Sequence, residues 1–151
     1  KGYYKNEEAT REVMTEDNYF LTGDVGYLDS ENYLYLTGRK KSLIVTEGGK
    51  NVFPEEIEDK FQLYDEIEQV LVRGYLKDKK YMSEEIEALI YPSEEMRGKY
   101  VQAELEERIR EIVSEINKSL HPYMWITSIK VLEKPLEMTT TKKIKRYKVS
   151  E

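Results

Sequence analysis

Between Thr37 and Glu58 a charged run, an apolar run, a double glycine and an acidic run follow one another closely. The structures expected for the rest of the chain can be placed on either side of this stretch. Two apolar, strand-like runs, Tyr33–Leu36 and Leu43–Val45, are separated by the charged segment Gly38–Lys41. A charged segment between apolar runs stays solvated while the chain changes direction. The sequence therefore predicts a joint at Gly38–Lys41, with different structures on its two sides.

A double glycine and a proline follow this joint. Gly48 and Gly49 are able to adopt positive φ, or to let another molecule lie against bare backbone. Pro54 suits the first position of a helix, and two glutamates come directly after it, where the helix dipole favours acids. The sequence therefore predicts a turn at the glycines and a helix over Pro54–Leu63.

The region ahead of the joint reads as a helix and three short strands. Asn6 is a good N-cap, which predicts a short helix over Glu7–Met14. Strands are predicted over Tyr19–Leu21, Val25–Leu28 and Tyr33–Thr37, and together they would form a small β meander. This region carries too little apolar surface to fold alone, so we expect it to pack on a larger body.

The region beyond the joint combines apolar runs of strand length with one long helical pattern. Apolar residues recur at spacings of three and four along Tyr100–Leu120, which predicts a long helix with one buried face. The other predictions are strands over Gln69–Val72, Ile86–Tyr91 and Ile129–Val131, and polar loops over Lys77–Ser83 and Pro92–Gly98. Three core strands and two main helices indicate an α+β fold, a small three-stranded sheet with packed helices that follows the short β meander.

Composition argues against several classes of function. Lys and Arg total 24 against 30 Asp and Glu, a formal net charge of -6, so nucleic-acid binding is disfavoured. The chain has no cysteine, so any thioester chemistry must use a thiol that a substrate brings. No apolar run approaches the roughly 20 residues that cross a bilayer, and no signal-peptide pattern is present. We therefore expect a cytoplasmic protein, and the start at Lys1 without methionine leads us to expect a cut inside a longer one.

Five segments of the chain carry a resemblance to a known family. They are GYYKNEEAT (Gly2–Thr10), TGDVGYLD (Thr22–Asp29), TGRKK (Thr37–Lys41), GGKNVFPEEIE (Gly48–Glu58) and PLEMTTTKKIKR (Pro135–Arg146). Their order and spacing resemble the AMP-forming adenylating enzymes, which include acyl-CoA synthetases, luciferases and peptide-synthetase adenylation domains. The joint and the last segment are most similar to long-chain fatty acyl-CoA ligases. The resemblance implies that residues 1–40 end a large N-terminal domain and that residues 41–151 form a C-terminal lid domain.

The resemblance also implies a reaction in two steps. A carboxylate attacks ATP to give an acyl-adenylate and pyrophosphate, and the thiol of coenzyme A then displaces AMP. Both steps gather negative charge around one phosphate, so they need fixed cations and close positioning. The implied cofactors are ATP/AMP, coenzyme A and Mg²⁺, the metal being held by ATP and the large N-terminal domain. The implied partners are that domain and a fatty acid, with no nucleic acid and with peripheral membrane contact of the full-length enzyme.

Three positions up to the first residue of the lid domain match functional residues of the family. Asp24 matches the acid that binds the ribose hydroxyls, and Arg39 matches the arginine beside the nucleotide. Lys41 matches the hinge about which the lid domain turns between the two steps. The alternatives are an ordinary turn acid, a solvated loop arginine and a surface lysine.

Three further positions match residues that the lid domain brings to the active site. Lys143 matches the catalytic lysine, which neutralises charge between the attacking carboxylate and the α-phosphate. The family has glycine before this lysine and this chain has Lys142, so Lys142 is the alternative, and a flexible basic tail is another. Gly48 and Gly49 match the loop that lies against the pantetheine arm of coenzyme A, and an ordinary hairpin turn is the alternative.

Two other functions remain compatible with the sequence. The same domain could deliver its acyl group to the phosphopantetheine of a carrier protein, or it could be an interaction module that kept the fold and lost the chemistry. The chain has no glycine-rich phosphate loop and no acidic cluster for a metal ion. We therefore expect these residues alone neither to adenylate a substrate nor to bind ATP tightly.

Overall fold

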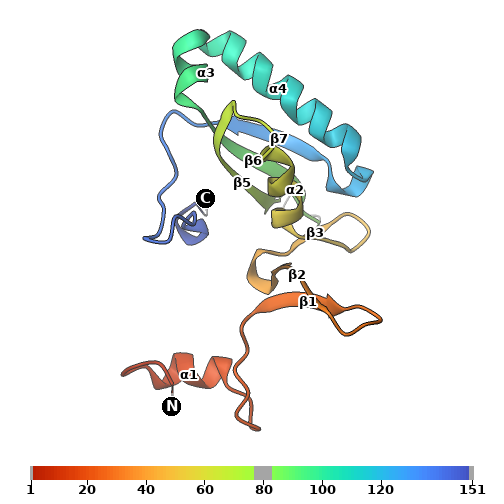
Figure 1. Cartoon of the computed structure of the whole chain (residues 1–151), viewed down its shortest axis with the longest axis vertical. Coiled ribbons are helices and arrows are strands. Elements are labelled where there is room, and N and C mark those ends of the chain that lie inside the picture. Colours follow the sequence, from red (N-terminus) through yellow and green to blue (C-terminus); the bar gives the residue numbers. More distant parts are fainter. Residues whose placement is uncertain (1, 77–82, 150–151) are drawn as a thin grey trace. The chain divides into compact units, whose positions relative to one another are not determined.

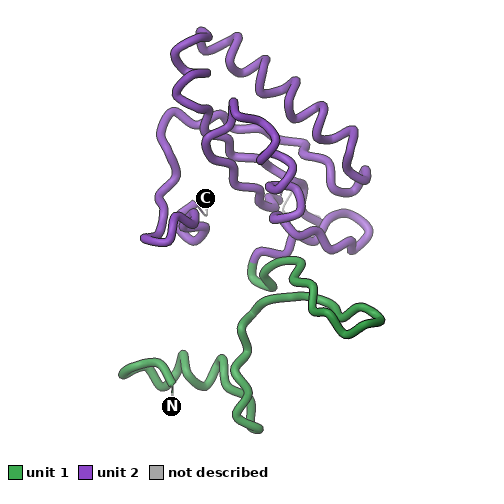
Figure 2. The backbone as a smooth tube through the Cα atoms, in the orientation of Figure 1, with its two compact units in different colours: residues 1–41 green, residues 42–151 purple. Residues whose placement is uncertain are grey.

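The computed structural model describes residues 2–76 and 83–149, and the chain divides into two compact units. The first unit is Lys1–Lys41 and the second is Ser42–Glu151, coloured separately in Figure 2. Most of the predicted polar loop Lys77–Ser83 lies outside the described residues.

The first unit consists of a helix and a hairpin. Helix α1 (Glu7–Val13) begins as predicted, with the side chain of Asn6 accepting a hydrogen bond from the Ala9 amide at 3.0 Å. Strands β1 (Asp24–Leu28) and β2 (Leu34–Arg39) form an antiparallel pair, which confirms the two later strands of the predicted meander.

Two predictions about the first unit are wrong. Tyr19–Leu21 is not a strand, because Phe20 forms only one isolated bridge, with Met14. Gly38 and Arg39 do not break the chain, since they pair with Val25 and Asp24 and so extend β2. The turn at the joint is a short 3₁₀ helix, η1 (Lys40–Ser42).

No described residue of the first unit is buried. Large apolar side chains are exposed on both strands of its hairpin, among them Tyr27 and Leu28 on β1 and Leu34 and Leu36 on β2. Tyr27 stacks on Tyr35 across the hairpin, with ring centroids 5.2 Å apart. Residues 2–41 therefore form local contacts without a core of their own.

The second unit is an α+β domain, as predicted. Its elements, labelled where there is room in Figure 1, are β3 (Ile44–Thr46), β4 (Lys50–Val52), α2 (Pro54–Phe61), β5 (Ile67–Tyr75), β6 (Glu85–Pro92), α3 (Glu94–Lys99), α4 (Gln102–Ser119), η2 (Pro122–Met124), β7 (Ile126–Val131) and η3 (Arg146–Lys148). The predicted three-stranded sheet has the order β5-β6-β7, with β5 and β6 antiparallel and β6 and β7 parallel. Strands β3 and β4 form a separate hairpin.

One face of the three-stranded sheet and the helices enclose the core. Val72 of β5 lies opposite Ala88 of β6, and both are fully buried. Helix α4 fulfils the prediction of one buried face, because the apolar residues Leu105, Ile109, Ile112, Val113 and Ile116 are all buried. Apolar burial on this scale is the main favourable contribution to folding.

Helix α3 corrects the predicted loop Pro92–Gly98. The hydroxyl of Ser93 accepts a hydrogen bond from the Met96 amide at 3.4 Å, which caps the helix at its first turn. Met96 is buried and belongs to the core cluster. Pro92 and Gly98 favoured a loop, whereas the Ser93 cap and the burial of Met96 favour a short helix.

The opposite face of the sheet contains a buried carboxylate, Glu87, which is only 3% exposed. Its oxygens accept hydrogen bonds from Arg73 Nε at 2.9 Å and Ser128 Oγ at 3.1 Å, and Lys130 Nζ lies 3.1 Å away. Burial alone would raise the pKa of Glu87, but these three partners outweigh it and hold the pKa below its usual value. Glu87 is therefore charged and fully paired inside the fold.

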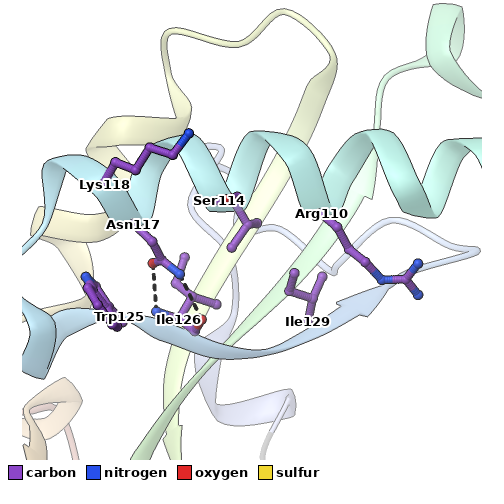
Figure 3. A pocket seen from close by; sticks show the side chains of 8 residues that line it. Arg110, Ser114, Asn117, Lys118, Trp125, Ile126 and Ile129 are labelled. Atoms are coloured by element: carbon purple, nitrogen blue, oxygen red, sulfur yellow. Dashed lines mark hydrogen bonds between the residues drawn. The ribbon is translucent and has the colours of Figure 1, made fainter.

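Helix α4 is tied to the start of β7 by one side chain. Asn117 accepts a hydrogen bond from the Ile126 amide at 2.9 Å and donates one to the Ile126 carbonyl at 3.1 Å, as Figure 3 shows. A groove beside this contact is lined by Arg110, Ser114, Lys118 and Trp125 among others, and it contains none of the predicted site residues. Of the helices in the described ranges 2–76 and 83–149, none combines the length and the apolar character that a membrane span needs.

Candidate functional site

The structure brings Asp24 and Arg39 together, two residues that were predicted to bind the nucleotide. They are cross-strand neighbours at the open end of the β1–β2 hairpin, and Arg39 Nη1 lies 3.0 Å from Asp24 Oδ1. Arg39 Nη1 also donates to the carbonyl of Thr22 at 2.7 Å, whose hydroxyl accepts from the Asp24 amide at 3.1 Å. The side chains of Asp24 and Arg39 are 34% and 58% exposed, so both are open to a polar ligand.

Lys41, the predicted hinge, lies in η1 at the last residue of the first unit. Its side chain is exposed, and the preceding Lys40 amide donates to the Gly23 carbonyl at 2.9 Å. Short 3₁₀ turns are common connectors between elements. The boundary between the two units thus falls directly after the predicted hinge.

Gly48 and Gly49 form the turn of the β3–β4 hairpin, which is the ordinary role that the sequence left open for them. Their φ angles are +78° and +71°, and the Gly49 amide donates to the Thr46 carbonyl at 3.1 Å. Positive φ at two successive positions explains why glycine occupies both. Both residues are exposed, and a Cβ built on either one meets no atom within 4 Å. The turn therefore leaves its backbone open to a ligand.

Lys143 lies in a tight hairpin within the segment Glu137–Lys148, which we call the basic loop. Met138 and Ile144 form an antiparallel bridge, and the Thr139 amide donates to the Lys143 carbonyl at 2.7 Å. The Lys143 amide donates in return to the Thr139 hydroxyl at 3.1 Å. The backbone of Lys143 is therefore fixed, while its side chain remains exposed.

The basic run Lys142–Lys148 is not a free tail, because its later cations are paired within the domain. Lys145 Nζ and Lys148 Nζ lie 3.3 Å and 2.6 Å from the Glu137 carboxylate, and these contacts lower the pKa of Glu137. Arg146 pairs with Glu58. No ion pair of Lys142 or Lys143 occurs in the part of the chain that the structure describes. The two candidate lysines are thus the exposed, unpaired cations of the basic loop.

The backbone of Lys142 distinguishes it from Lys143. Lys142 has φ +58°, the left-handed conformation that glycine adopts most readily, and its amide donates to the Thr139 carbonyl at 3.0 Å. The resembled family has glycine at this position. Lys142 therefore fills the turn position of the hairpin, and Lys143 is the residue that follows the turn.

Replacing Lys142 with glycine is expected to stabilise the chain by up to about 1 kcal/mol, because glycine relieves the left-handed backbone. Urea unfolding of the two proteins measures the difference. Lys142→Ala is the matched control, since alanine keeps the Cβ and should give no such gain. An equal gain from alanine would contradict the assigned turn geometry.

Glu58, which the sequence did not single out, joins the basic loop to the body of the domain. One oxygen of Glu58 on α2 accepts from the Val72 amide at 2.7 Å, and the other accepts from Arg146. Burial has the largest influence on this carboxyl and raises its pKa, against the opposing effects of Arg146 and the Val72 amide. The partners are far apart in sequence, so no local pattern predicts this contact.

Figure 1 shows the glycine turn and the basic loop on opposite sides of the second unit. In that view the β3–β4 turn points to the right and the C-terminal segment lies at the left. Among the residues described, no hydrogen bond joins the two regions. The two regions therefore lie far apart within the second unit.

The family described as the C-terminal domain of AMP-binding enzymes matches residues 41–151. The chain belongs to this family. Over 76 residues it is 49% identical to the long-chain-fatty-acid–CoA ligase FadD15 of Mycobacterium tuberculosis, a match that spans 50% of this chain and 12% of that protein. Over 74 residues it is 46% identical to the 2-succinylbenzoate–CoA ligase of Oceanobacillus iheyensis, a match that spans 49% of this chain and 15% of that protein.

Solved structures of adenylating enzymes share this fold. The o-succinylbenzoate CoA synthetase of Bacillus subtilis, solved with its acyl-adenylate, superimposes with a TM-score of 0.73 at 26% identity, over 100% of this chain and 28% of that chain. The adenylation domain of a carboxylate reductase from Mycobacterium chelonae has a TM-score of 0.83 at 23% identity, over 98% of this chain and 24% of that one. The chain therefore corresponds to roughly a quarter of these larger proteins.

The described residues include no group of three or more metal-ligating side chains that could hold a metal ion. The exposed Asp24–Arg39 pair does fit a nucleotide, because it offers an acceptor and a planar cation side by side.

Proposed function

We propose that this chain is the C-terminal part of an AMP-forming fatty acyl-CoA synthetase that acts on long-chain fatty acids. Residues 1–40 would end the large N-terminal domain, and residues 41–151 would be the lid that turns about Lys41. The proposal assigns a carboxylate, ATP and coenzyme A to the full-length protein as substrates, with Mg²⁺ held by ATP and the N-terminal domain. It also assigns the protein to the cytoplasm, with peripheral membrane contact.

The observation that carries this proposal is the exposed Lys143 ammonium on a hairpin fixed by its own backbone. Two hydrogen bonds with Thr139 hold the Lys143 backbone, and no acidic side chain of the described residues pairs with Lys143. A fixed, unpaired cation suits the stabilisation of charge at a phosphate that develops during reaction. Its neighbours Lys145 and Lys148 share the Glu137 carboxylate as an ion-pair partner, so they suit that role less well.

The remaining residues divide between the two steps. Asp24 would accept hydrogen bonds from the ribose hydroxyls, while Arg39 would hold Asp24 in place and contact the nucleotide. Lys143 would serve acyl-adenylate formation. Gly48 and Gly49 would replace it in the second step, where their open backbone would lie against the pantetheine arm.

Substrate choice is tested with the full-length protein by pyrophosphate exchange. The relatives include ligases for long-chain fatty acids, for 2-succinylbenzoate and for sulfoacetate, so these three acids form the panel. We expect kcat/KM for palmitate to exceed that for either other acid by about tenfold or more, since the proposal places an apolar acyl pocket in the large N-terminal domain, and such a pocket favours a long alkyl chain. A preference for either of the other two acids would contradict the long-chain assignment.

Transfer to a carrier protein is a second candidate for the thiol step. A structure of the A-PCP didomain of carboxylic acid reductase from Segniliparus rugosus is similar to this chain, with a TM-score of 0.75 at 25% identity over 98% of this chain and 21% of that one. The acidic first turn of α2 would repel an acidic carrier protein that approached it. Competition between coenzyme A and a phosphopantetheinylated carrier in the same assay separates the two.

A further inference from the structure

Three elements of the second unit meet at the guanidinium of Arg146. Arg146 Nη1 donates to the Val72 carbonyl of β5 at 3.0 Å, and Nη2 donates to Glu58 of α2. The other oxygen of Glu58 accepts from the Val72 amide. One ion pair therefore satisfies both backbone groups of Val72 on the edge of the sheet.

This ion pair is better shielded from solvent than the other contacts of the basic loop. The side chains of Glu58 and Arg146 are 18% and 32% exposed, whereas Glu137 is 58% exposed. Exposed pairs are screened by water, and the Glu137 contacts join the basic loop only to itself. The shielded pair with Glu58 thus attaches the middle of the basic loop to α2 and β5.

A second carboxylate, Glu55, also lies near Arg146, so loss of the Arg146 charge would affect two acidic side chains. Glu55 Oε1 lies 3.9 Å from Arg146 Nη2, and Glu55 Oε2 is buried without a hydrogen-bond partner among the described residues. Without Arg146, two carboxylates on the same face of α2 would face each other with no cation between them. The basic loop would then lose its attachment at Arg146, three residues after Lys143.

We propose that Glu58 and Arg146 are positioning residues, which hold the basic loop so that the Lys143 ammonium reaches the reacting phosphate. This inference rests on the proposed role of Lys143. Displacing a catalytic cation by about 1 Å lowers the reaction rate on the order of a hundredfold. Contacts that hold the basic loop in place therefore affect the rate directly.

The test compares three variants of the full-length protein: Arg146→Ala, Arg146→Lys and the control Arg108→Ala. Arg108 is also an arginine paired with glutamates, Glu66 and Glu111, but it lies on α4 and does not contact the basic loop. Hydrogen exchange of the Lys142–Lys145 amides is measured first, because it does not depend on catalysis. We expect exchange there to rise about tenfold or more in Arg146→Ala and to stay unchanged in the control.

The kinetic readout separates the two steps of the reaction. Arg146→Ala should lower acyl-adenylate formation by about 10- to 100-fold, while thioester formation from supplied acyl-adenylate changes by less than about threefold. Arg146→Lys keeps the charge but cannot donate to Glu58 and the Val72 carbonyl with one planar group, so it should fall between wild type and alanine. Equal loss in both steps would indicate general unfolding and would overturn the positioning role.

Failure of this inference can be told apart from failure of the proposed function. If Lys143→Ala lowers adenylation while Arg146→Ala changes neither exchange nor rate, the positioning role alone is wrong. A different result would be that Arg146→Ala raises hydrogen exchange in the basic loop while Lys143→Ala leaves the adenylation rate unchanged. In that case the role assigned to Lys143 is wrong, and so is the predicted kinetic effect of Arg146.

Discussion

Replacing Lys143 with alanine in the full-length protein is expected to lower the rate of acyl-adenylate formation by about 100- to 1,000-fold. The same change should leave thioester formation from supplied acyl-adenylate within about threefold of wild type. Removal of one fixed charge donor from a transition state has an effect of this size because the donor acts where charge develops. In the proposed second step the Gly48–Gly49 turn faces the site, so the lysine contributes nothing there.

Single-turnover measurements of each step check this prediction. Lys142→Ala is the matched control, because Lys142 is the neighbouring unpaired cation and lies at the turn position of the same hairpin. It should retain most of the adenylation rate. A larger loss from Lys142→Ala than from Lys143→Ala would move the catalytic role to Lys142, and an equal loss of both steps in Lys143→Ala would refute a role in one step alone.

The elements of the second unit were predictable because their patterns are local. The spacing of apolar residues in α4 and the strand-length runs of β5 and β6 gave the correct element types, with shifts of a few residues at their ends. Helix α3 was missed although Ser93 and two following glutamates are a typical helix start. The signal was present, but Pro92 and Gly98 outweighed it.

The contacts that hold the basic loop against the rest of the domain were not predictable, because their partners are far apart in sequence. Arg146 meets Glu58 across 88 positions, and nothing in either neighbourhood distinguishes these residues from other surface charges. The positive φ of Lys142 is a different case: its turn is local, and the lysine itself gives no sign of it, although the glycine of the resembled family at this position does. Family resemblance supplied the candidate residues, and the three-dimensional structure supplied the reasons why they are held where they are.

Replacing Glu87 with alanine is expected to lower the free energy of unfolding of this chain by about 1.5–3 kcal/mol, the usual range for hydrogen bonds to a charged group. Glu87 is buried on the sheet and satisfies Arg73 and Lys130 together, so its removal leaves two cations without their shared partner. Arg73 also donates to the Val149 carbonyl, so the end of the C-terminal segment should loosen as well. Urea unfolding measures the loss, and Glu107→Ala, an exposed glutamate on α4 that pairs with Arg110, should change stability by only about 0.5 kcal/mol or less.

The pH dependence gives an independent check on the same residue. Because the pKa of Glu87 is lowered in the folded state, its charged form contributes stability above the usual glutamate pKa near 4.5, and that contribution disappears as the pH falls through the lowered value. The stability difference between wild type and Glu87→Gln should therefore be largest near neutral pH and shrink on acidification below about pH 4.5. A difference that stayed constant down to pH 3 would show that the buried charge at Glu87 contributes nothing to stability and that the variant acts only through packing.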